Sequence, residues 1–91
     1  PNLIICRTFS KAYGLASLRI GYAMANVQVI DMMNRVRQPF NVNSMAQAAA
    51  VAALADKDFV QQTFVLNRNG MKQIVDALGK LGLEHIPSFG N

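Results

Sequence analysis

The alanine-rich segment 45–55 constrains the fold most, because it has almost no polar face. Its sequence is MAQAAAVAALA, and as a helix it would present small apolar side chains nearly all round. Helices of this kind are buried inside a domain, where small side chains let neighbouring elements approach closely. A chain of 91 residues keeps much of its surface in contact with water. We therefore expect this helix to belong to a domain larger than the chain itself.

Hydrophobic patterning predicts an α/β arrangement of two short strands followed by three helices. The first apolar run, 3–6, is typical of a strand buried on both faces in a parallel or mixed sheet. Gly14 is a candidate turn point in the connection that follows, and Pro39 interrupts the chain between the first two helices. The predicted elements are strands at 3–6 and 19–25 and helices at 27–36, 45–55 and 58–81.

The predicted helix ends carry recognisable caps. Asn26 can cap the first helix, and either Asn43 or Ser44 can cap the second. Gly82 is a plausible C′ residue after the third helix. The segment 83–86 is apolar enough to predict the start of a further strand.

Composition excludes several classes of function. Nine Lys and Arg against five Asp and Glu give a net charge of +4, but the basic residues are scattered without aromatic residues between them. We therefore expect no nucleic-acid partner. The alternative is a small basic nucleic-acid-binding module, which a salt-dependent affinity for duplex DNA would support. The single cysteine, Cys6, excludes an internal disulfide and a thiolate zinc cluster. No apolar run reaches the roughly 18–20 residues of a membrane span. We expect a cytoplasmic protein with no metal site and no membrane partner.

The stretch 8–22, TFSKAYGLASLRIGY, carries the residues with the most distinctive chemistry. It follows a predicted buried strand, and functional groups often gather at such strand ends in α/β folds. Lys11 supplies a primary amine that can form an imine. Arg19 supplies a planar, permanently charged fork for phosphate oxygens, and the hydroxyls of Thr8 and Ser10 can donate to the remaining oxygens. Together they suit a phosphorylated cofactor bound covalently through an amine.

Each of these residues also has a purely structural interpretation. Lys11 would then be a surface lysine in a loop, and Arg19 an ordinary solvated or ion-paired arginine. Thr8 and Ser10 would be turn residues whose hydroxyls bond the nearby backbone. Tyr13 could either pack in the core or line the site. The residues alone leave these alternatives open.

The stretch 8–22 resembles the pyridoxal-phosphate (PLP) aminotransferases of the aspartate-aminotransferase fold type, also called fold type I. Their pattern is a hydroxyl residue, any residue, Ser or Ala, the Schiff-base lysine, a Gly-Leu-type loop, and then Arg-x-Gly followed by Tyr or Phe. Every one of these positions is filled here. The resemblance implies that Lys11 is the catalytic, cofactor-bearing lysine and that Thr8, Ser10 and Arg19 bind the cofactor phosphate.

The resemblance extends over essentially the whole chain. It continues through RQPFNVN at 37–43 and reaches PSFGN at 87–91. It implies a fragment of the large PLP-binding domain over 1–86, with 87–91 as a connector towards a small C-terminal domain. In the family, the acidic partner of the pyridine nitrogen and the arginine that grips the substrate carboxylate lie outside the part of the enzyme that this chain matches.

Within that family the sequence is most similar to the histidinol-phosphate aminotransferases. The resemblance implies a homodimer that transfers an amino group between amino-acid and phosphorylated small-molecule substrates in histidine biosynthesis. Two further alternatives remain. One is a related PLP enzyme, either an aromatic aminotransferase or a phosphoamino-acid decarboxylase. The other is a non-catalytic structural fragment, and we expect the isolated chain to be inactive even if its parent is an enzyme.

Overall fold

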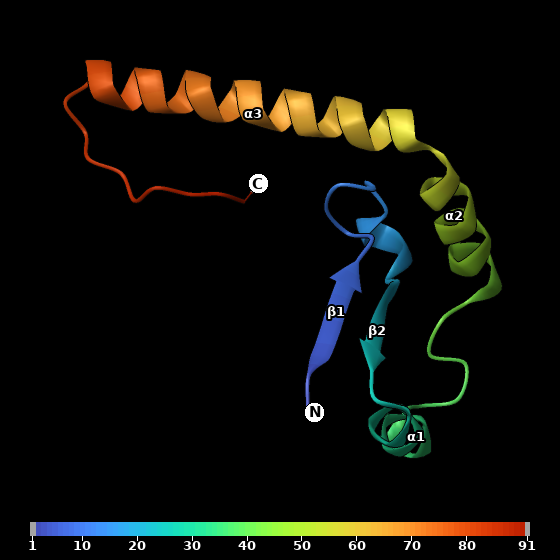
Figure 1. Ribbon diagram of the computed structural model, residues 1–91. Coiled ribbons are helices and arrows are strands. Elements are labelled where there is room, and N and C mark those ends of the chain that lie inside the picture. The colour runs from blue at the N-terminus through green and yellow to red at the C-terminus, as the bar shows by residue number, and fades with distance from the viewer. Residues whose placement is uncertain (1, 91) are drawn as a thin grey trace. The chain divides into compact units, whose positions relative to one another are not determined.

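A computed structural model describes residues 2–90 of the chain (Figure 1). It divides the chain into two compact units, with the boundary between Ala55 and Asp56. The order of two strands followed by three helices confirms the predicted one. The elements are β1 (Ile4–Thr8), a short 3₁₀ turn (Ala16–Leu18), β2 (Gly21–Ala25), α1 (Val27–Val36), α2 (Ser44–Ala55) and α3 (Lys57–Lys80).

Strands β1 and β2 form a two-stranded antiparallel sheet in the first unit. Ile4 pairs with Ala25 at one end, and Thr8 pairs with Gly21 at the other. The expectation of a strand buried on both faces in a parallel or mixed sheet is wrong for this structure. The pairing is antiparallel, and every residue of β1 is exposed, because the described residues 2–90 cover neither face of the strand.

Helices α1 and α2 begin at the caps that the sequence predicted. The Asn26 side chain accepts a hydrogen bond from the Gln28 backbone N–H at 2.9 Å, which satisfies one of the free donors of the first turn of α1. Of the two candidate caps for α2, Asn43 is the one used. Its side-chain oxygen accepts from the Ala46 N–H at 2.8 Å, and the helix therefore starts at Ser44.

Helix α2 is buried along one stripe rather than all round. Ala46 and Ala50, one turn apart, are buried. Met45 and Val51 remain 76% and 71% exposed. The residues that the structure describes therefore cover only the alanine stripe of a helix whose composition is apolar on every side.

Helix α3 and the segment after it make up the second unit. The Asp56 side chain caps α3 by accepting from the Phe59 N–H at 3.0 Å. Gly82 takes a left-handed backbone, φ +67°, directly after the helix. The Leu83 N–H then donates to the Leu78 carbonyl at 3.0 Å, and the Gly82 N–H to the Gly79 carbonyl at 3.1 Å. These two bonds form a Schellman motif, which confirms Gly82 as the C′ residue.

The strand expected at 83–86 does not form. The second unit offers no strand for these residues to pair with, and the structure leaves them without regular secondary structure. The chain instead runs back along α3 (Figure 1), and the Asn67 side-chain amide donates to the Gly90 carbonyl at 3.3 Å. None of the helices in residues 2–90 has the length and hydropathy needed to cross a membrane.

Candidate functional site

The loop 9–20 joins the paired ends of β1 and β2 and carries Ser10, Lys11 and Arg19, whereas Thr8 is the last residue of β1. Beyond the pair of Thr8 with Gly21, the Phe9 N–H donates to the Ile20 carbonyl at 3.2 Å, so the antiparallel register continues by one step. Ser10 and Arg19 are the residues next to this hydrogen-bonded pair. The structure therefore places Thr8, and next to the Phe9–Ile20 pair also Ser10 and Arg19, at one end of the sheet.

The Thr8 hydroxyl forms a local turn. Its Oγ1 accepts a hydrogen bond from the Ser10 backbone N–H at 3.0 Å, as the structural interpretation of this residue predicted. A hydroxyl has one donor and two acceptor lone pairs, so this bond leaves the Thr8 proton available. The turn and an interaction with an anion are therefore compatible.

Arg19 adopts a left-handed backbone conformation, with φ +52°. Non-glycine residues rarely take this conformation, which costs about 1–2 kcal/mol. Its guanidinium Nη1 donates to the Ala16 carbonyl at 2.7 Å. Among residues 2–90 the ion pair formed is that of Arg35 with Asp31, so no described carboxylate neutralises Arg19. Its remaining N–H donors are suited to an anion such as phosphate.

Lys11 lies exposed in the turn that follows β1. Its carbonyl accepts from the Gly14 N–H at 2.9 Å, and Gly14 has φ +69°. This confirms Gly14 as the turn point of the loop. The amine is thus carried on an ordered backbone, next in sequence to the hydroxyl of Ser10 and at the same end of the sheet as Arg19.

Phe9 was not predicted to matter for the site, because it occupies the unspecified position of the family pattern. It is nevertheless 3% exposed and is the one side chain larger than alanine that is buried in the described part of the chain. Its ring centroid lies 4.9 Å from that of Tyr13 and 6.0 Å from that of Tyr22. The sequence feature that could have indicated this packing is the pair of aromatic residues, Phe9 and Tyr13, on either side of Lys11.

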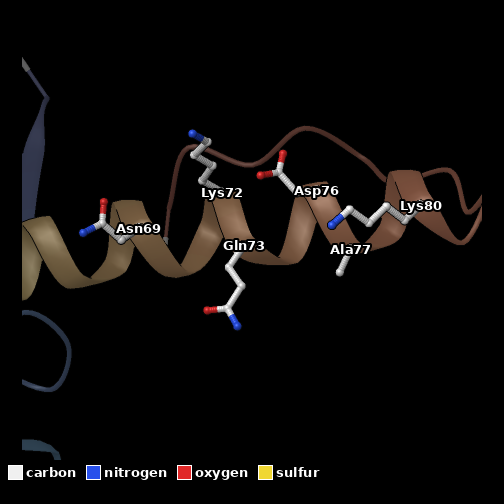
Figure 2. A pocket seen from close by; sticks show the side chains of 6 residues that line it. All are labelled: Asn69, Lys72, Gln73, Asp76, Ala77 and Lys80. Carbon is white, nitrogen blue, oxygen red and sulfur yellow. The ribbon is translucent and has the colours of Figure 1, made fainter.

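A shallow depression along α3 contains none of the predicted site residues. Figure 2 shows the side chains of Lys72 and Asp76 on one side of the helix and that of Gln73 on another. The residues that line it are Asn69, Lys72, Gln73, Asp76, Ala77 and Lys80. All six come from one helix, and charged side chains at this spacing are typical of a solvated helix face. The described residues also contain no cluster of three or more His, Cys, Asp or Glu side chains able to hold a metal ion.

Comparison with known proteins decides the family. The model of the family described as aminotransferase class I and II matches residues 1–91. The chain belongs to the class I and II aminotransferases. The chain is 64% identical over 91 residues to histidinol-phosphate aminotransferase 1 of Dechloromonas aromatica. The alignment covers 100% of the chain and 25% of that relative. It is 61% identical over 90 residues to the histidinol-phosphate aminotransferase of Methylobacillus flagellatus, covering 99% of the chain and 24% of that relative.

A solved structure supports the same aminotransferase fold. It comes from Erwinia carotovora atroseptica, and its protein is likewise assigned as a histidinol-phosphate aminotransferase. The TM-score is 0.91 at 34% sequence identity, over 97% of this chain and 25% of that chain. The two strands and three helices are therefore a fragment of an aminotransferase fold, and the chain spans about a quarter of the length of the relatives it matches.

Proposed function

We propose that the protein containing this chain is a PLP-dependent histidinol-phosphate:2-oxoglutarate aminotransferase. The observation that carries the proposal is the grouping of one amine, two hydroxyls and one guanidinium at a single end of the β1–β2 sheet, in a chain of the aminotransferase family. Names of the similar proteins support the substrate, since they are histidinol-phosphate aminotransferases at 61–64% identity.

The donor set of the loop suits PLP, which combines an anionic phosphate with an aldehyde. Arg19 would hold the phosphate with its planar fork, and Thr8 and Ser10 would donate to other phosphate oxygens. Lys11 would attach the cofactor through its amine. When bound, PLP supplies the electron sink that makes the substrate Cα proton acidic.

Lys11 would have a second role, as a proton carrier, when its amine is free of the cofactor. The free amine would take the proton from the substrate Cα and return it at the cofactor C4′, acting first as general base and then as general acid. The exposed side chain and the hydrogen-bonded turn that carries it support this role, because the long flexible stem lets the amine move while the backbone stays fixed.

The remaining expectations belong to the same proposal. Residues 1–86 would form part of the large PLP-binding domain, and 87–91 would connect it to a small C-terminal domain; Asn91 lies outside the described residues. The whole enzyme would be a cytoplasmic homodimer acting on amino-acid and phosphorylated substrates. These features are supported by membership of the aminotransferase family.

The deciding experiment locates the cofactor on the full-length protein. PLP is added, the bond is reduced with borohydride, and the modified peptide is identified by mass spectrometry. We expect the label on Lys11 and no visible cofactor absorption or turnover in Lys11→Ala. Lys57→Ala is the matched control, because Lys57 lies at the start of α3, and it should behave as wild type. A label on Lys57, Lys72 or Lys80 instead would refute the assignment.

Substrate choice needs a separate assay on the wild-type enzyme. Histidinol phosphate, an aromatic amino acid and a phosphoamino acid are each supplied with 2-oxoglutarate, and glutamate formation and CO₂ release are both measured. We expect glutamate formation to be fastest with histidinol phosphate. Faster transfer from the aromatic amino acid, or CO₂ release from the phosphoamino acid, would support the corresponding alternative enzyme.

A further inference from the structure

We propose that Phe9 and Tyr13 form an aromatic clamp that positions Lys11 for attachment to the cofactor. The inference rests on the proposed function, because it takes Lys11 as the residue that binds PLP. Neither clamp residue would touch the reacting atoms; both would act through the backbone of the turn that carries Lys11.

The first observation is the burial of Phe9 beside an exposed reactive residue. Phe9 is 3% exposed, whereas Lys11, two residues later, is exposed. A buried aromatic side chain holds one position because its neighbours surround it. The buried ring of Phe9 therefore fixes the position at which the turn begins.

The backbone of Phe9 is held as firmly as its ring. Its N–H donates to the Ile20 carbonyl at 3.2 Å, and its carbonyl accepts from the Leu15 N–H at 2.9 Å. The first bond ties Phe9 to the residue before β2, and the second ties it across the loop. Both polar groups of the residue are thus used in fixing where the loop starts.

The second observation is the symmetry of the two rings about Lys11. Phe9 precedes Lys11 by two residues and Tyr13 follows it by two. Their ring centroids lie 4.9 Å apart with an interplanar angle of 45°, a favourable tilted contact. The bond from the Gly14 N–H to the Lys11 carbonyl, at 2.9 Å, closes the turn. The ring contact therefore joins residues that precede and follow Lys11 in the turn.

This arrangement matters because the lysine side chain is long and flexible. With the backbone fixed, the amine samples only the region that its own stem can reach. With the turn loosened, that region widens and the fraction of time spent near the cofactor aldehyde falls. Misplacement by about 1 Å can cost on the order of 100-fold in rate.

The test compares three variants of the full-length enzyme, each stripped of PLP and then mixed with it. Tyr13→Leu removes the ring from the turn, whereas Tyr13→Phe keeps it. Tyr22→Leu is the matched control, because it makes the same change in the other aromatic neighbour of Phe9 but outside the turn. The measured quantities are the rate of covalent attachment, followed by visible absorption and borohydride trapping, and the dissociation constant of pyridoxine 5′-phosphate. That compound has the phosphate but no aldehyde, so it cannot bond to lysine.

We expect Tyr13→Leu to slow attachment at Lys11 by about 10-fold or more. Tyr13→Phe and Tyr22→Leu should stay within about twofold of wild type, and pyridoxine 5′-phosphate should bind all variants equally. All measurements are made below the Tm of each variant. If Tyr13→Leu does not yield folded protein, Tyr13→Met, which keeps apolar bulk without a ring, takes its place.

Three results would overturn the clamp: wild-type attachment in Tyr13→Leu, equal slowing in Tyr22→Leu, or a parallel loss of pyridoxine 5′-phosphate affinity. The last would show that the whole loop is disturbed rather than the lysine alone. If borohydride instead trapped the cofactor of the wild-type enzyme on a lysine other than Lys11, the proposed function would be refuted. Failure of the clamp and failure of the proposed function are therefore separate outcomes.

Discussion

The Arg19 guanidinium donates to the Ala16 carbonyl at 2.7 Å, and Arg19 itself has a left-handed backbone. The two features belong together, because the left-handed turn at the end of the 3₁₀ segment bends the chain towards β2. One N–H is used in this local bond, and the others remain for an anion. The side chain is thus held in place before any ligand arrives.

Replacing Arg19 by lysine tests the value of the planar fork. Arg19→Lys keeps the positive charge and the energetic cost of the left-handed backbone. The lysine amine cannot bind the Ala16 carbonyl and phosphate oxygens in the geometry of a guanidinium. We expect PLP binding by the full-length enzyme to weaken by about 1.5–3 kcal/mol, measured as the dissociation constant. Arg35→Lys, in the exposed pair with Asp31 on α1, is the control and should bind PLP as wild type. An unchanged dissociation constant in Arg19→Lys would remove Arg19 from the phosphate site.

Thr8 offers a test of the hydroxyl turn. Thr8→Val preserves the shape but leaves the Ser10 N–H without its acceptor at 3.0 Å. Losing one hydrogen bond of this kind costs about 1 kcal/mol. We therefore expect a lower Tm together with weaker PLP binding, whereas Thr8→Ser should keep both near wild type. If Thr8→Val binds PLP as tightly as wild type, the hydroxyl is a turn residue and nothing more.

A substitution at Gly21 tests how closely β1 and β2 approach each other beside the candidate site. A Cβ at this position would lie 2.6 Å from the Arg7 carbonyl oxygen, which is too close for the pairing to persist. Gly21→Ala should therefore push β1 and β2 apart and destabilise the enzyme by about 1–3 kcal/mol, seen as a lower Tm. Gly70→Ala in α3 makes the same change where nothing lies within 4 Å, and there the Tm should rise or stay constant. Equal behaviour of the two variants would contradict this account.

The isolated 91-residue chain should self-associate and lack transaminase activity. Large apolar side chains such as Met45, Val51 and Phe64 are more than half exposed in it. Exposed apolar surface on this scale promotes association between copies. Sedimentation of the purified chain, with glutamate-dependent amino transfer measured in parallel, checks both statements. A soluble monomer with measurable turnover would show that the active site needs less of the enzyme than we infer.

Local sequence determined the helices and singled out the residues of the candidate site. The boundaries of α1 were predicted without error, and those of α2 and α3 within one residue, because capping side chains and the 3.6-residue period act over a few neighbouring positions. Gly14 and Gly82 were identified as turn residues for the same reason, since both need a positive φ. Thr8, Ser10, Lys11 and Arg19 were predicted as site residues because their residue types suit a phosphorylated cofactor and because the stretch around them resembles the PLP aminotransferases.

Only the tertiary structure decided which strands pair and how the loop is held. The apolar run at β1 did not reveal its antiparallel partner, and the run at 83–86 formed no strand, because pairing depends on what lies beside a segment in space. The burial of Phe9 and its contact with Tyr13 were hidden for the same reason. A residue type states what a side chain can do, whereas its neighbours, brought together from distant parts of the chain, determine whether it is buried, bonded or free to react.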